Sequence, residues 1–235
     1  MTKPRLLFLP GLLEDADAFT QVIEGMREAA DCSVADLTRS NSIAGMARDV
    51  LKEAPEGPLA LAGHSMGGYV ALEVMRQAPG KVERLALHNP NARPDSAEST
   101  ENRRRAMALA QRDFPAVIEA LLPKQLTPEH LQDTEITGTI TSMALSVGKE
   151  AFARQQGANI GRIDSRPHLK AIACPTLVIA ARNDQIMPVE VLKELADGIP
   201  GSRLTTIEDC GHMSTLEQPA KVLEALLDWV QRKTK

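Results

Sequence analysis

Aromatic residues are scarce in this chain of 235 residues, where Phe, Trp and Tyr together make up 3%. A core or pocket with so few aromatic side chains must be built mainly from aliphatic residues and from the nine methionines. Apolar residues as a whole are not scarce, at 43%, and charged residues make up 25%. These values are typical of globular proteins and exclude the composition of a disordered chain.

Long apolar runs and a strong charge of one sign are also missing. The apolar stretch 6–9 is interrupted by Pro10 and Gly11, so it is too short for a signal peptide or a membrane span. The formal net charge is −4, and acidic and basic residues are mixed along the chain, which gives no footprint for nucleic acid. The sequence predicts a cytoplasmic monomer or homodimer that binds neither membrane nor nucleic acid.

Cysteine is rare as well. The three cysteines are widely spaced and odd in number, which argues against a disulfide framework and shows no metal-ligand pairing. The five histidines lack zinc-type spacing, and no glycine-rich phosphate loop is present. We therefore expect reduced, mostly buried thiols, no metal and no cofactor.

Short apolar runs alternate with amphipathic segments over most of the chain. The runs 5–9, 32–37, 59–62, 82–88, 176–181 and 203–207 mostly lack period-two alternation, as strands buried on both faces do. Segments 17–29, 43–54, 66–77, 189–197 and 219–232 carry apolar residues at helical spacing. The alternation predicts an α/β fold with an open, mostly parallel sheet of about six strands flanked by helices.

The alternation fails between residues 91 and 166. This stretch lacks a convincing strand and reads as helices over 97–112, 115–122, 128–147 and 149–159. Because it lies between the fourth and fifth expected strands, we interpret it as an all-helical lid inserted into a core domain of residues 1–90 and 167–235. Arg166, at the return to the sheet, is expected to anchor the hinge through a salt bridge rather than to bind substrate.

The segment 59–72 predicts a strand, a tight turn and a helix around Gly63-His64-Ser65-Met66-Gly67. A Gly-x-Ser-x-Gly sequence in that context is typical of a nucleophile elbow, where the glycines allow close backbone approach and the turn exposes the serine. The helix start also places N–H groups beside a developing oxyanion. Ser65 is the predicted nucleophile.

A serine hydroxyl needs a general base, and that base needs an orienting carboxylate. Asp184 follows the expected strand 176–181, and His212 follows the expected strand 203–207, so the chain order is Ser, Asp, His. Asp209 and Asp36 compete for the role of the acid, but a turn-forming role is favoured for Asp209 and a surface or capping role for Asp36. Histidines 64, 88, 130 and 168 are first read as structural or surface residues, with a pocket role left open for His88.

With these motifs, and the turn Leu9-Pro10-Gly11-Leu12, nearly the whole chain resembles the α/β-hydrolase superfamily, in particular small lidded bacterial esterases and ring-cleavage-product hydrolases. The resemblance implies a catalytic triad of Ser65, Asp184 and His212, with oxyanion N–H groups from Leu12 and Met66. Members of that family commonly have His-Gly where this chain has Pro10-Gly11, so the first donor could shift from Leu12 to Leu13.

The predicted function is hydrolysis of carboxylic esters of small substrates through an acyl-enzyme, without a cofactor. Leu13, Met187 and Met213 are the side chains expected to contact the substrate, in a pocket suited to short acyl groups. Two alternatives stay open: a C–C bond or enol-lactone hydrolase with the same triad, and a non-catalytic small-molecule receptor on the same fold.

Overall fold

A computed structural model describes residues 3–232 of the chain. Its single sheet contains six parallel strands in the order β2-β1-β3-β4-β5-β6. The strands are β1 (Arg5–Leu9), β2 (Asp31–Val34), β3 (Leu59–His64), β4 (Val82–His88), β5 (Thr176–Ala181) and β6 (Arg203–Ile207). The predicted fold class is confirmed, although β2 begins at Asp31 and ends at Val34 rather than running over 32–37.

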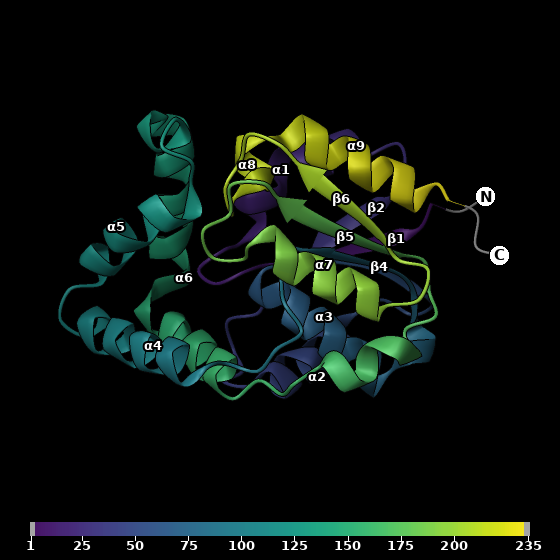
Figure 1. Cartoon of the computed structure of the whole chain (residues 1–235), viewed down its shortest axis with the longest axis horizontal. Coiled ribbons are helices and arrows are strands. Elements are labelled where there is room, and N and C mark those ends of the chain that lie inside the picture. Colours follow the sequence, from purple (N-terminus) through teal and green to yellow (C-terminus); the bar gives the residue numbers. More distant parts are fainter. Residues whose placement is uncertain (1–2, 233–235) are drawn as a thin grey trace.

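Helices cover both faces of the sheet (Figure 1). One face packs against α2 (Ile43–Glu53), α3 (Met66–Gln77) and α7 (Val189–Gly198), and the other against α1 (Thr20–Met26) and α9 (Pro219–Val230). Leu7 and Leu9 of β1 face the first layer, and Leu6 and Phe8 face the second. This division explains why β1 is apolar without alternation: successive side chains enter different cores, and both cores exclude water.

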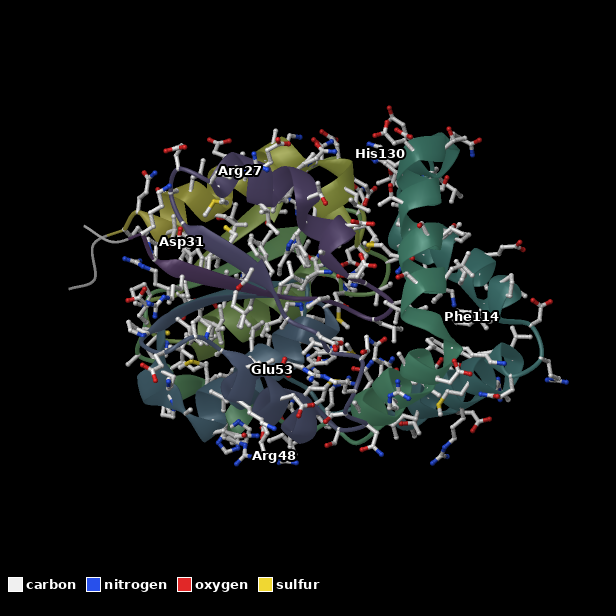
Figure 2. All side chains as sticks on the ribbon, turned by 180° about the vertical axis from the view of Figure 1, so that it is seen from behind. Arg27, Asp31, Arg48, Glu53, Phe114 and His130 are labelled. Atoms are coloured by element: carbon white, nitrogen blue, oxygen red, sulfur yellow. The ribbon has the colours of Figure 1, made fainter. Side chains whose placement is uncertain are left out.

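The helices between β4 and β5 form a separate layer beyond one end of the sheet. They are α4 (Ala97–Ala110), α5 (Phe114–Gln125) and α6 (Thr134–Ile160), with a small core of their own that includes Phe152 and Leu13. Figure 1 shows them on the side toward which the arrowheads of β5 and β6 point, and in Figure 2 the labelled Phe114 and His130 lie on this layer, away from Asp31. We call α4–α6 the lid; its domain limits, 91–166, stay a prediction.

The predicted lid helices differ from the observed ones mainly where local capping determines the residue at which a helix begins. The expected helix 128–147 begins only at Thr134, because the Asp133 carboxylate caps it by accepting the Glu135 and Ile136 N–H groups at 2.9 and 3.3 Å. A short 3-10 helix, His130–Gln132, precedes that cap. The expected break at Gly148 is a kink, with φ 80° and ψ 163°, between two segments that continue as α6.

The start of α3 lies against the end of β1. A Cβ atom at Gly67 would overlap the carbonyl oxygen of Leu9 and come within 2.7 Å of the Pro10 carbonyl oxygen, and a Cβ at Gly63 would come within 2.5 Å of the Gly67 carbonyl oxygen. Glycine is therefore required on both sides of Ser65 by close backbone approach. This contact fixes the loop after β1 relative to the turn after β3.

We expect Gly67→Ala to lower the free energy of unfolding by about 3 kcal/mol or more, because backbone atoms cannot move aside as a side chain can. Gly138→Ala is the matched control: Gly138 lies inside α6, and a Cβ atom there would meet no atom of the described residues within 4 Å. That change should raise stability by about 0.5–1 kcal/mol through helix propensity. Urea unfolding of both variants checks this, and equal stability of the two would contradict the packing argument.

Candidate active site

Ser65 occupies the sharp turn between β3 and α3. Its backbone has φ 49° and ψ −115°, a conformation that L-residues rarely adopt. The turn is held by two hydrogen bonds, from Ser65 N to the His88 carbonyl (2.8 Å) and from Gly68 N to the Ser65 carbonyl (2.9 Å). The strained backbone directs the hydroxyl away from the sheet while α3 begins directly behind it.

His212, in the loop after β6, reaches the serine. Its Nε2 lies 2.8 Å from Ser65 Oγ, and the residue is 3% exposed. The His212 carbonyl oxygen accepts two hydrogen bonds, from His64 Nε2 and from Asn89 Nδ2, each at 3.0 Å. Asn89 also accepts the Ala181 N–H at 2.9 Å, so one side chain ties the loop to the ends of β4 and β5.

Asp184, in the loop after β5, holds the other side of the imidazole. Its Oδ2 lies 2.6 Å from His212 Nδ1, and its Oδ1 accepts the N–H groups of Ile186 (2.7 Å) and Met187 (2.9 Å). Burial by itself would raise the pKa of this carboxyl, but the attraction of His212 and these hydrogen bonds hold the pKa below its ordinary value. An ionised Asp184 requires hydrogen on Nδ1, which leaves the Nε2 lone pair for the Ser65 hydroxyl.

The competing acids lie elsewhere. The Asp209 side chain is 82% exposed and lies 3.5 Å from Lys221 Nζ, and its φ of 60° places it in a tight turn. Asp36 accepts the Thr38 N–H and hydroxyl. Asp184 is therefore the carboxylate at His212, and the structure brings Ser65, His212 and Asp184 together from three different loops.

Three backbone N–H groups near Ser65 were candidates for binding an oxyanion. The Leu13 N–H donates to Gln155 Oε1 of α6 at 3.0 Å, and Gln155 is 1% exposed. Within residues 3–232, no acceptor pairs with the N–H of Leu12 or of Met66. Leu12 and Met66 thus remain available, whereas Leu13 is engaged by the lid.

A buried acid–base pair, which the sequence analysis did not find, lies behind the serine. Glu14 Oε1 and Oε2 lie 2.8 and 2.9 Å from His64 Nδ1, and Glu14 Oε2 also accepts the Gly11 N–H at 2.7 Å. Burial lowers the pKa of His64, but the charge of Glu14 and the hydrogen bonds to Glu14 and to the His212 carbonyl outweigh it, so the pKa lies above the ordinary 6.5. Both ring nitrogens face acceptors, as an imidazolium requires. The pair connects the loop after β1 to the loop of His212.

A second buried carboxylate, also missed, ties the lid to the same loop. The Glu217 side chain is 0% exposed and accepts the Gly211 N–H (2.9 Å), the Thr127 N–H (3.0 Å) and His130 Nδ1 (2.9 Å). The sequence context of His130 suggested a free surface residue, but in the structure the ring pairs with the buried Glu217. The only signal for Glu217 was its position in a short helix directly after His212.

A narrow cavity of about 10 Å³ lies between the lid and the loops that flank the serine. Its lining is largely apolar and comes from the loop after β1, from α5 and α6, and from the residue after His212: Leu12, Leu13, Glu14, Ile118, Leu121, Gln125, Ile140, Met143, Ala144 and Met213. Leu13 and Met213 line this cavity, and their contact with substrate stays a prediction. Met187 does not line this cavity; its sulfur accepts from Asn91 Nδ2 at 3.2 Å and it packs in the core.

The remaining candidates, Arg166 and His88, do not line the lid cavity. Arg166 pairs with Asp164 at 2.6 Å, in keeping with the expected hinge. His88 is 6% exposed and bonds Ser214 Oγ at 2.6 Å behind the turn, outside the lid cavity, and burial together with the neighbouring His64 and His212 lowers its pKa well below 6.5.

The cysteines are unpaired, with Cys210 buried and Cys32 and Cys174 half-buried rather than mostly buried. Burial raises the pKa of the Cys210 thiol to about 12, which disfavours the nucleophilic thiolate. Over residues 3–232, no group of three or more His, Cys, Asp or Glu side chains could hold a metal ion. No helix in that range has both the length and the apolar character needed to cross a membrane.

Comparison with known proteins places this geometry in context. The family described as "Alpha/beta hydrolase family" matches residues 8–225. A protein of Variovorax paradoxus named "Putative carbamate hydrolase RutD" is 31% identical over 208 residues, which cover 85% of this chain and 77% of that protein. A pimeloyl-[acyl-carrier protein] methyl ester esterase of Nitrosomonas europaea is 24% identical over 230 residues, covering 92% of this chain and 91% of that protein.

Solved structures share the fold. A thermophilic esterase from Thermogutta terrifontis superposes with a TM-score of 0.90 at 29% identity, covering 98% of this chain and 90% of that one. The enol-lactonase from Burkholderia xenovorans gives the same TM-score at 22% identity, covering 99% and 93%, a likeness that concerns the fold alone.

Replacing Glu14 by Gln removes the charge that keeps His64 protonated, and we expect a pH-dependent loss of stability. A histidine whose folded pKa lies above its unfolded value contributes stability that is fully present below about pH 6.5 and is lost as the pH rises through the folded pKa. The difference in unfolding free energy between the wild type and Glu14→Gln should therefore be larger at pH 6 and shrink toward pH 9.

Urea unfolding at several pH values measures this difference. Glu56→Gln, an exposed carboxylate, is the matched control and should cost little at any pH. A Glu14→Gln penalty that stays constant from pH 6 to pH 9 would show that His64 is not held protonated.

Proposed function

This chain belongs to the α/β hydrolase family, and we propose that it is a serine hydrolase that cleaves carboxylic esters of small substrates through an acyl-enzyme. The observation that carries the proposal is the continuous chain of hydrogen bonds from Ser65 Oγ to His212 Nε2 (2.8 Å) and from His212 Nδ1 to Asp184 Oδ2 (2.6 Å). This arrangement activates a hydroxyl that would otherwise be a poor nucleophile.

In the proposed mechanism, Ser65 Oγ attacks the ester carbonyl while His212 Nε2 takes its proton. Asp184 keeps the imidazole in the required tautomer and stabilises the imidazolium that forms. The N–H groups of Leu12 and Met66 receive the oxyanion, and each such donor is worth about 10²–10³ in rate. His212 then protonates the leaving alkoxide. A water molecule, deprotonated by the same His212, releases the acid from Ser65.

The cavity supports a preference for small substrates. Its volume of about 10 Å³ is far below the roughly 300–1,000 Å³ of ligand pockets, and most of its lining is aliphatic or methionine. Leu13 and Met213 are the proposed substrate contacts from the core. An acyl group enters this space only if lid side chains move aside, which favours short groups over long ones.

The similarity to the Variovorax protein favours a second candidate, hydrolysis of a carbamate. The same serine could attack a carbamate carbonyl, because a carbamate differs from an ester only in a nitrogen on the carbonyl carbon. A panel of esters, carbamates, enol-lactones and vinylogous diketones separates these reactions. Binding without turnover of any of them would favour a receptor.

Ser65→Ala should lower kcat/KM for 4-nitrophenyl acetate by about 10⁴-fold or more, because the nucleophile is lost while the fold is kept. The control is Ser142→Ala, an exposed serine on α6 that should leave the rate unchanged. Labelling by a fluorophosphonate should occur in the wild type and in Ser142→Ala, and fail in Ser65→Ala. Full ester hydrolysis by Ser65→Ala would exclude the proposed nucleophile.

Across 4-nitrophenyl esters from acetate to dodecanoate, we expect kcat/KM to peak at short chains, about two to six carbons, because longer chains must displace more of the lid side chains that close this space. Initial rates below the solubility limit of each ester measure this profile. A steady rise to dodecanoate would rule out the small-substrate assignment.

A further inference from the structure

One polar side chain in the lid cavity has no role in the mechanism above. Gln125, the last residue of α5, is 8% exposed and lines the cavity, and its Oε1 has no hydrogen-bond partner among the described residues. A buried amide oxygen without a partner costs about 1–3 kcal/mol. Such an atom in a native fold calls for an explanation, and a ligand that supplies the missing donor is one.

Gln125 is one of the two polar side chains in the described lining of this cavity. Apart from Glu14, the other lining side chains are apolar. The Glu14 carboxylate is already engaged by the Gly11 N–H and by His64. Among the described residues that line the cavity, Gln125 is therefore the polar side chain that still has an acceptor without a hydrogen-bond partner.

The backbone holds Gln125 close to the proposed machinery. Its carbonyl oxygen accepts the Met213 N–H at 3.2 Å, next to His212. The lining of the same cavity also includes Leu12, whose N–H is a proposed oxyanion donor. A substrate bound at Ser65 with a group under the lid would bring that group against the Gln125 carboxamide.

We propose that Gln125 is a specificity-determining residue that selects substrates bearing a secondary amide or carbamate group within the part held under the lid. This inference rests on the proposed ester hydrolase function. The unpaired Gln125 Oε1 is an acceptor, and the N–H of a secondary amide or carbamate supplies the missing donor. An alkyl chain leaves Oε1 unpaired, and a carboxylate would face Glu14 with no cationic side chain in the described lining to balance it.

Two pairs of matched substrates test the proposal, one for each side of the ester. On the acyl side, the 4-nitrophenyl ester of N-acetylglycine is compared with that of 4-oxopentanoate, which replaces the N–H by CH₂. On the alcohol side, 2-acetamidoethyl acetate is compared with 4-oxopentyl acetate, with acid release followed by pH-stat. Each pair keeps shape and the distal carbonyl and changes only the N–H.

The variants are Gln125→Met and Gln125→Leu, which remove the carboxamide with two different apolar shapes. Gln132→Met, an exposed glutamine of the lid, is the matched control. For each pair, the measured quantity is kcat/KM for the amide divided by kcat/KM for the matched ketone. In at least one pair, this ratio should be about tenfold or more higher in the wild type than in either Gln125 variant. Taking the ratio between enzymes cancels the different intrinsic reactivity of the two esters. Gln132→Met should keep the wild-type ratio.

The outcomes separate the two levels of the argument. Unchanged amide preference in both Gln125 variants, for both pairs, overturns the role of Gln125 while ester hydrolysis by Ser65 stands. Absence of wild-type hydrolysis of every ester overturns the proposed function, and this inference falls with it. A circular dichroism spectrum and a Tm of Gln125→Met close to those of the wild type show that the variant is folded, so a lost preference reflects the missing carboxamide.

Discussion

The site depends on one constraint of parallel sheets: the carboxyl ends of all strands meet at the same edge, so the loops that follow them lie together. Leu12 follows β1, Ser65 follows β3, Asp184 follows β5 and His212 follows β6. Residues as far as 147 positions apart in sequence thereby come within 2.8 Å of each other. The lid helices lie beyond this same edge (Figure 1).

Positioning at this edge has a local cost that the surrounding structure offsets. The Ser65 backbone is strained, and it persists because glycines on either side allow the start of α3 to approach β1 more closely than any side chain would permit. Behind the turn, the buried Glu14 and His64 join the loop after β1 to the His212 carbonyl. A buried charge pair is a weak source of stability but a strong geometric restraint, because breaking it leaves an uncompensated charge.

The lid is joined to the site by hydrogen bonds rather than resting on it. Gln155 of α6 engages the Leu13 N–H, the Gln125 carbonyl engages the Met213 N–H, and the Glu217 side chain joins Thr127 and His130 to Gly211. These contacts end on the loops of the proposed oxyanion donor and of His212. Movement of the lid would therefore displace both loops, so the shape of the lid cavity is coupled to the geometry of the site.

The sequence by itself determined the fold class, because apolar runs of strand length alternating with helical patterns have few compact solutions. It also identified Ser65, Asp184 and His212 as a set, since each stands directly after a predicted strand and the shared edge follows from parallel pairing. What it could not determine were contacts between side chains distant in the chain that have no local pattern. Glu14, Gln125, Gln155 and Glu217 resemble ordinary polar residues of helices and turns until folding buries them. Met187 shows the converse, because its position beside Asp184 suggested the substrate pocket, whereas packing turns its sulfur toward Asn91. Local propensity and spacing decide where strands and turns lie, but burial and hydrogen-bond pairing across the lid decide which side chains line the cavity, and only the tertiary structure brings those partners together.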